Sequence, residues 1–286
     1  MVARPAAETA SSAPVVPALR WLLYTAAVLV FLAGVQLFVF PLRTDRYFAW
    51  TIDSPMTAVF LGASYWSAMG LEVGAARAKE WAGARVAVPA VFVFTSLTLL
   101  VTLWHLDRFH IATDLGPATQ AVTWTWLAIY TFVPVLLVVA VLAQRRSSTA
   151  VPPPSGLPAP VQPVLAGLAV LLLGLGIALL IAPSWADAAW PWPLTPLTGR
   201  AVGAWLVGLG TATAHALVIR DRPSLRPLGV AGVGFGLLQT IALLRHGDEL
   251  DWGTPAAVGY VTVLAVVTVL SACALLPSPT PTRPDH

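Results

Sequence analysis

Eight apolar stretches follow one another along the chain, separated by short polar segments. They cover residues 21–42, 55–75, 86–104, 121–143, 164–182, 197–219, 227–244 and 255–276. About 20 apolar residues in helical form cross the ~30 Å hydrocarbon layer of a bilayer. Strands of a membrane barrel would instead alternate in polarity over ~10 residues. Because the backbone in lipid must bond internally, the pattern predicts an all-α integral membrane protein with eight transmembrane helices.

The composition agrees with lipid as the main solvent and the lipid bilayer as the main partner. Hydrophobic residues make up 57% of the chain and charged residues 10%, whereas soluble domains carry about 25% charged residues. The mean hydropathy is +0.78. The single cysteine, Cys273, excludes an internal disulfide and a cysteine-based metal centre.

The segments between the apolar stretches divide the chain into five parts. Residues 1–19 are expected to be a disordered cytoplasmic tail, and residues 277–286 a second disordered tail. The Pro-rich segment 147–162 is expected to be an extended cytoplasmic linker. Two four-helix units, residues 20–146 and 163–276, lie on either side of this linker. The first apolar stretch exceeds the ~7–15 residues of a signal-peptide core, so we expect it to be retained.

The distribution of basic residues indicates an orientation. If the N-terminus is cytoplasmic and eight helices alternate, eleven basic residues lie inside and five outside. The positive-inside rule then predicts that both termini are cytoplasmic, in a multi-pass protein of the cell (inner or plasma) membrane. Six tryptophans fall near the outer boundary and are expected to be interface anchors: Trp50, Trp104, Trp185, Trp190, Trp192 and Trp252.

The two halves of the chain resemble each other at a shift of 141 residues. Between residues 50–107 and residues 191–248, 12 of 58 positions are identical. The rarest shared feature is a His-x-Asp motif, present as His105–Asp107 and as His246–Asp248. Each half holds an even number of helices, so both halves enter the membrane in the same direction. We therefore expect two tandem, parallel four-helix repeats.

The paired motifs and the arginines beside them predict a ligand-binding vestibule on the outer face, formed by His105, Asp107, Arg108, Arg245, His246 and Asp248. Imidazole and carboxylate also suit a divalent metal, with the candidate ligands His105, Asp107, His110, His246 and Asp248. Residues two apart on a helix point about 200° apart, so binding of one ion requires a loop conformation. A haem with two axial histidines, His105 and His246, is a further alternative without a covalent attachment motif.

Few polar groups interrupt the helices themselves. Glu72 lies near the inner boundary and is expected to extend toward water, while His215 is expected to be a hydrogen-bonded packing residue. Gly232 and Gly236 form a Gly-xxx-Gly spacing, which is typical of close helix packing.

Three classes of function stay open. The first is a transporter or permease-like protein for a small solute or ion. The second is a membrane-embedded metal- or haem-binding protein, or an enzyme, that uses the paired His-x-Asp motifs. The third is a non-catalytic scaffold. The sequence holds no phosphate-binding loop, dinucleotide fingerprint or nucleophile motif, so no reaction is indicated. Topology explains the inner basic residues, so we expect no nucleic-acid binding.

Overall fold

A computed structural model describes residues 13–111, 116–147 and 154–276. In these ranges all regular elements are helices, and β-type pairing is limited to isolated bridges. Eight long helices coincide with the eight apolar stretches: α1 (Pro17–Gly34), α3 (Pro55–Arg77), α5 (Ala87–Trp104), α6 (Pro117–Ser147), α7 (Val161–Ile181), α9 (Pro196–Ile219), α10 (Arg226–His246) and α11 (Pro255–Leu275). The predicted all-α class is confirmed.

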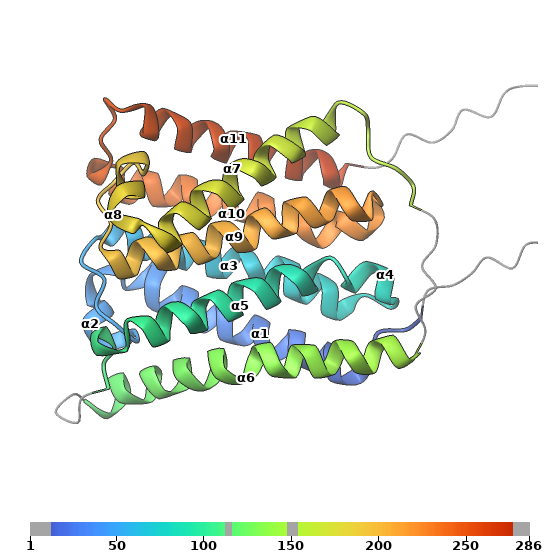
Figure 1. Ribbon diagram of the computed structural model, residues 1–286, viewed down its shortest axis with the longest axis horizontal. Helices are drawn as coiled ribbons and strands as arrows, with labels where there is room; N and C mark the ends of the chain where they lie inside the picture. The colour runs from blue at the N-terminus through green and yellow to red at the C-terminus, as the bar shows by residue number, and fades with distance from the viewer. Residues whose placement is uncertain (1–12, 112–115, 148–153, 277–286) are drawn as a thin grey trace, which may run out of the picture.

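The long helices lie side by side along one direction (Figure 1). The short helices α2 (Thr44–Tyr47) and α8 (Pro183–Ala186) lie at one end of the bundle, which we call the α8 end. The short helix α4 (Trp81–Ala84) lies at the opposite end, the α4 end. The helix α5 begins directly after α4, so the loop that follows α5 lies at the α8 end. The loop that follows α10 lies at the same end.

Seven helices of the described residues are long and apolar enough to cross a membrane, which makes the chain a polytopic membrane protein. The remaining long helix, α3, has 23 residues but is less apolar, with Glu72 and Arg77 near its end. Its position explains its composition. Of its 23 residues 15 are buried by protein, so few of its side chains would need to face lipid.

Two helices, α3 and α9, form the centre of the bundle. In each of them 15 residues are buried, whereas α11 buries only Ala257 and Leu264. The helix α3 packs against α1 and α10, and α9 packs against α7 and α5. Two further pairs, α5 with α6 and α10 with α11, complete the bundle.

A hydroxyl residue followed by proline starts three of the long helices. The side chains of Ser54, Thr195 and Thr254 accept a hydrogen bond from the backbone N–H three residues later. The next residue is a proline in each case, and proline has no N–H to leave unsatisfied in the first turn. These caps fix where α3, α9 and α11 begin.

Glycine permits the closest helix contacts of the bundle. A Cβ added to Gly62 of α3 would lie 2.5 Å from the backbone nitrogen of Phe38, in the π-helical turn η1 (Val35–Val39). A Cβ added to Gly203 of α9 would lie 2.7 Å from the carbonyl oxygen of Gly176 in α7. Small residues of this kind let the backbones of neighbouring helices approach each other.

The Gly-xxx-Gly spacing of α10 has the packing role expected of it. A Cβ at Gly232 would collide with the hydroxyl of Ser271, and one at Gly236 with the hydroxyl of Thr268. Both hydroxyls belong to α11, so α11 lies directly on this glycine face.

Half of the six tryptophans expected at the interface have a different role. Three are exposed, as interface residues would be: Trp104, Trp185 and Trp252. The other three are at most 7% exposed: Trp50, Trp190 and Trp192. Trp50 packs against Phe48 and Trp126, and Trp190 packs against Trp192 and Phe60. Loops that fold back over the bundle bury these rings, which the linear pattern does not reveal.

Parts of the predicted N-terminal tail and of the predicted linker are ordered. Residues 1–12, 148–153 and 277–286 lie outside the described residues. The segment 13–16 is held in place, because Trp81 N–H donates to the carbonyl of Ala13 (2.7 Å) and Val16 N–H donates to Gln144 (2.8 Å). Pro17–Leu19, assigned to the tail from the sequence, already belong to α1. In the linker, Ser155 donates to Asp221 (2.9 Å).

Substitution of Gly203 tests the close contact of α9 with α7. We expect Gly203→Val to lower the free energy of unfolding by about 1–3 kcal/mol, because the added side chain must displace Gly176 or Leu179. Thermal unfolding of the detergent-purified protein measures this change. The control is Gly259→Val in α11, where an added Cβ meets nothing within 4 Å. Equal stability of the two variants would contradict the contact.

Candidate functional site

The first His-x-Asp motif lies at the end of α5. His105 Nε2 lies 3.0 Å from the guanidinium of Arg200 in α9. Arginine can only donate, so Nε2 is the acceptor. Burial lowers the pKa of His105, and the nearby charge of Arg200 lowers it further. His105 is therefore a neutral imidazole at pH 7 whose Nε2 lone pair is already in use.

The other residues of this loop do not converge on His105. Asp107 pairs with Arg108 (3.2 Å), and both side chains are exposed. His110 uses both of its ring nitrogens, because Nδ1 lies 3.0 Å from the carbonyl oxygen of Phe48 and Nε2 lies 3.0 Å from the Thr51 hydroxyl. His110 thus ties its loop to the loop after η1.

The second motif lies at the end of α10. Arg245 donates to the carbonyl oxygen of Phe38 (2.7 Å) and lies over the ring of that residue. His246 Nε2 is buried and has no hydrogen-bond partner among the described residues, and Asp248 is exposed. No hydrogen bond or ion pair joins the two motifs across the described part of the bundle.

The described residues do not bring together a metal centre at this end. Among the described residues no three His, Cys, Asp or Glu side chains form a group that could hold a metal ion. Asp114 of the same loop lies outside the described residues. The metal and haem alternatives stay predictions, and the geometry gives the two motifs different surroundings.

Two further contacts between the two halves at the α8 end involve residues that the motif analysis did not single out. The carboxylate of Glu249 accepts from the Ser54 hydroxyl (2.6 Å) and from Met56 N–H (2.9 Å). It therefore caps the positive N-terminus of α3. Trp192 Nε1 donates to Thr57 Oγ1 (2.9 Å) in the same turn of α3. The sequence offered no local signal for either contact.

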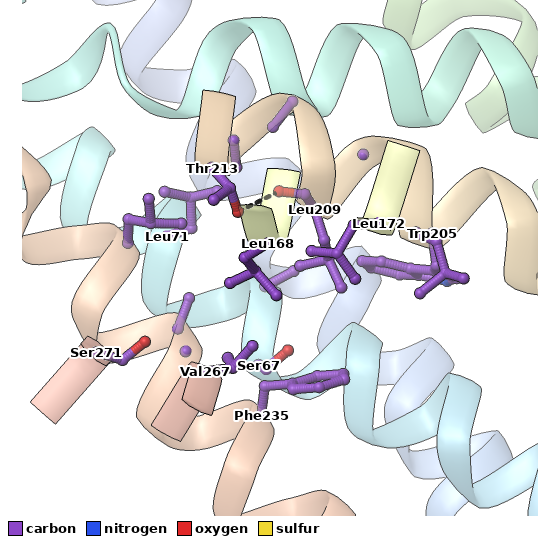
Figure 2. Close-up of a pocket in the computed structure, with 18 of the residues that line it drawn as sticks. Ser67, Leu71, Leu168, Leu172, Trp205, Leu209, Thr213, Phe235, Val267 and Ser271 are labelled. Carbon is purple, nitrogen blue, oxygen red and sulfur yellow. Dashed lines mark hydrogen bonds between the residues drawn. The ribbon is translucent and has the colours of Figure 1, made fainter. Parts of the chain in front are cut away.

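A cavity of about 890 Å³ lies among the helices and is lined by residues of all eight long helices. Ligand pockets typically measure ~300–1,000 Å³. Figure 2 shows part of its wall, with mostly apolar side chains from α7, α9, α10 and α11 and with Ser67 and Leu71 of α3. The labelled apolar residues there include Leu168, Leu172, Trp205, Leu209, Phe235 and Val267.

The cavity holds few polar groups. The hydroxyls of Ser67, Thr95 and Thr213 line it, but each donates to a carbonyl of its own helix. The hydroxyls of Tyr65 and Tyr130 lie 2.7 Å apart and hydrogen bond to each other. The hydroxyl groups are thus satisfied within the protein, although their oxygens can still accept.

Glu72 also lines this cavity and differs from these hydroxyls. The residue is 3% exposed, and its Oε2 has no hydrogen-bond partner among the described residues. The expectation that Glu72 extends to water is wrong, because neighbouring helices enclose it. His215 is half-buried, and its Nδ1 also lacks a hydrogen-bond partner among the described residues.

The two halves differ in the contact between their first and last long helices. In the first half α1 packs against α6. In the second half α7 and α11 make at most marginal contact, although side chains of both helices line the cavity.

No family model, curated protein or solved structure matches this chain.

Removal of the Glu249 carboxylate tests the contact between the halves. We expect Glu249→Ala to destabilise the protein by about 1–3 kcal/mol, because the Ser54 hydroxyl and Met56 N–H lose their acceptor. Asp248→Ala removes an exposed neighbouring acid and should have little effect. Thermal unfolding of both variants measures the difference. A similar loss in both would mean that the cap contributes nothing specific.

Proposed function

We propose that this chain is a permease-like protein of the cell membrane that binds a small, largely apolar amphiphile in its intramembrane cavity. The observation that carries the proposal is the cavity of about 890 Å³ with its apolar lining. An apolar molecule gains free energy in such a cavity roughly in proportion to the apolar area it buries. The proposal replaces the predicted outer vestibule with the cavity as the main binding site.

The edge between α7 and α11 supports access from the bilayer. Leu168 and Leu172 of α7 and Val267 of α11 line the cavity, and the two helices have little contact with each other. An amphiphile dissolved in lipid could enter between them without first crossing water. The class of function is therefore recognition or carriage of a membrane-soluble molecule.

We also propose that all eight long helices cross the membrane and form two parallel repeats. The packing pairs support this arrangement, because α1–α3 corresponds to α7–α9, α5–α6 to α10–α11, and α3–α10 to α9–α5. Residues that correspond at the shift of 141 residues also have the same structural role in the two halves. Ser54 and Thr195 both cap a central helix, and Gly62 and Gly203 both admit a neighbouring helix.

The repeat proposal gives α3, with 23 residues, the same orientation as α9, which has 24 residues and is apolar enough to span. The α4 end is then cytoplasmic and the α8 end faces outward, in agreement with the distribution of basic residues.

Cavity filling tests the binding proposal. We expect the purified wild type to bind dodecanol in a 1:1 complex that native mass spectrometry detects, and Leu172→Trp to lose it. Leu172 is 7% exposed and lines the cavity, so a larger side chain there occupies ligand space. Val170→Trp is the control, because Val170 of the same helix is 71% exposed. Equal binding by both variants would exclude the cavity as the site.

Cysteine labelling in intact cells tests the orientation. In a Cys273→Ser background, we expect a membrane-impermeant maleimide to label Asp107→Cys without lysis. We expect Arg146→Cys to be labelled only after lysis. Both positions are exposed, so accessibility to the reagent depends on the side of the membrane. The reverse pattern would invert the orientation, and labelling of both in intact cells would contradict the single crossing by α6 between them.

A further inference from the structure

Glu72 is the feature of the cavity that protein contacts leave unexplained. It is 3% exposed, and its Oε2 has no hydrogen-bond partner in the described part of the chain. The ion pairs found there are Arg46–Asp45 and Arg108–Asp107, neither of which involves Glu72. A buried polar group without a partner is costly, and acidic residues inside a membrane usually have a functional partner.

The surroundings of Glu72 favour a positive partner. Of the described residues that line the cavity, Glu72 is the only acid and Arg222 the only base. The Arg222 guanidinium already donates to the carbonyl oxygens of Cys273 (2.6 Å) and Leu276 (2.8 Å) at the end of α11. Arg222 is thus directed toward the end of α11, and Glu72 is left without a positive partner among the described residues.

Aromatic rings in the wall of the cavity add to this preference. Five of the rings that line it come from the four helices α3, α5, α6 and α9: Tyr65, Phe94, Trp126, Tyr130 and Trp205. The faces of aromatic rings attract cations, with tryptophan the strongest, and the attraction grows when the cation is desolvated. An apolar cavity with one carboxyl group and several ring faces matches a molecule with a hydrophobic body and a single positive charge.

We propose that the ligand is a lipophilic amine, bound as its ammonium form with the nitrogen at the Glu72 carboxylate and the alkyl part among the apolar side chains. This inference rests on the proposed function and specifies its ligand class. The corresponding position of the second half is Thr213, whose hydroxyl lines the cavity but carries no charge. One ammonium group is therefore bound per chain.

The test compares two probes of equal chain length, dodecylamine and dodecanol, in a neutral maltoside detergent at pH 7. Binding of each radiolabelled probe is measured by equilibrium dialysis against protein-free micelles. The variants are Glu72→Gln, which keeps the shape of the side chain and removes its charge, and Glu80→Gln, which removes an equal charge from an exposed residue outside the cavity lining.

We expect the wild type to bind dodecylamine more tightly than dodecanol. Glu72→Gln should weaken dodecylamine binding roughly thirty-fold or more, since the buried ammonium loses its counter-charge. Dodecanol binding should change by less than about two-fold, and Glu80→Gln should resemble the wild type. An unchanged dodecylamine affinity in Glu72→Gln, or an equal loss for both probes, would overturn the inference.

The outcomes separate this inference from the proposed function. If the wild type binds dodecanol and dodecylamine with equal affinity, and Leu172→Trp binds neither, the cavity is a binding site but the proposed amine specificity is wrong. If the wild type binds neither probe, the proposed function itself fails.

A measurement on the wild type covers the case in which Glu72→Gln does not fold. The apolar reagent dicyclohexylcarbodiimide adds to buried carboxyl groups, and mass spectrometry of peptides locates the adduct. We expect modification of Glu72 that dodecylamine prevents and an equal concentration of dodecanol does not. Equal protection by the two probes, or no protection by either, would contradict an ammonium at this carboxylate.

Discussion

The close approach of each central helix to its neighbour is the constraint on which the rest of the structure depends. At Gly62 and at Gly203 no space remains for a Cβ atom, because backbone atoms of η1 and α7 occupy it. These contacts enclose α3 and α9 on one side and leave their other faces to pack on α10 and α5. Enclosure in turn allows α3 to carry a carboxyl group, which would be costly on the lipid-facing side of a helix.

The helices were predictable from the sequence because apolar length and cap chemistry are local properties. The stretch 55–75 identifies α3 to within two residues, and the stretch 197–219 identifies α9 to within one. The predicted linker was less accurate, because the pairing of Ser155 with Asp221 joins positions 66 residues apart. No periodicity in the sequence encodes such a contact.

The candidate site was harder to predict, because its contacts also join residues that are far apart in the sequence. Sequence position placed Glu72 near the membrane boundary, but only the packing of neighbouring helices shows that it is buried. His105 was singled out as a possible ligand, yet its Nε2 is occupied by Arg200, 95 residues away. The identity of the polar residues was informative, whereas their partners depend on how the two halves fit together.

The cap that Glu249 places on α3 has a consequence for biosynthesis. Ser54 is translated 195 residues before the carboxylate that accepts its hydrogen bond, so the start of α3 lacks this contact until almost the whole chain has been synthesised. Trp192, which donates to Thr57, arrives earlier but also belongs to the second half. The first four long helices are therefore synthesised before the side chains that complete the start of α3, and a chain truncated after α6 would leave Met56 N–H without this acceptor.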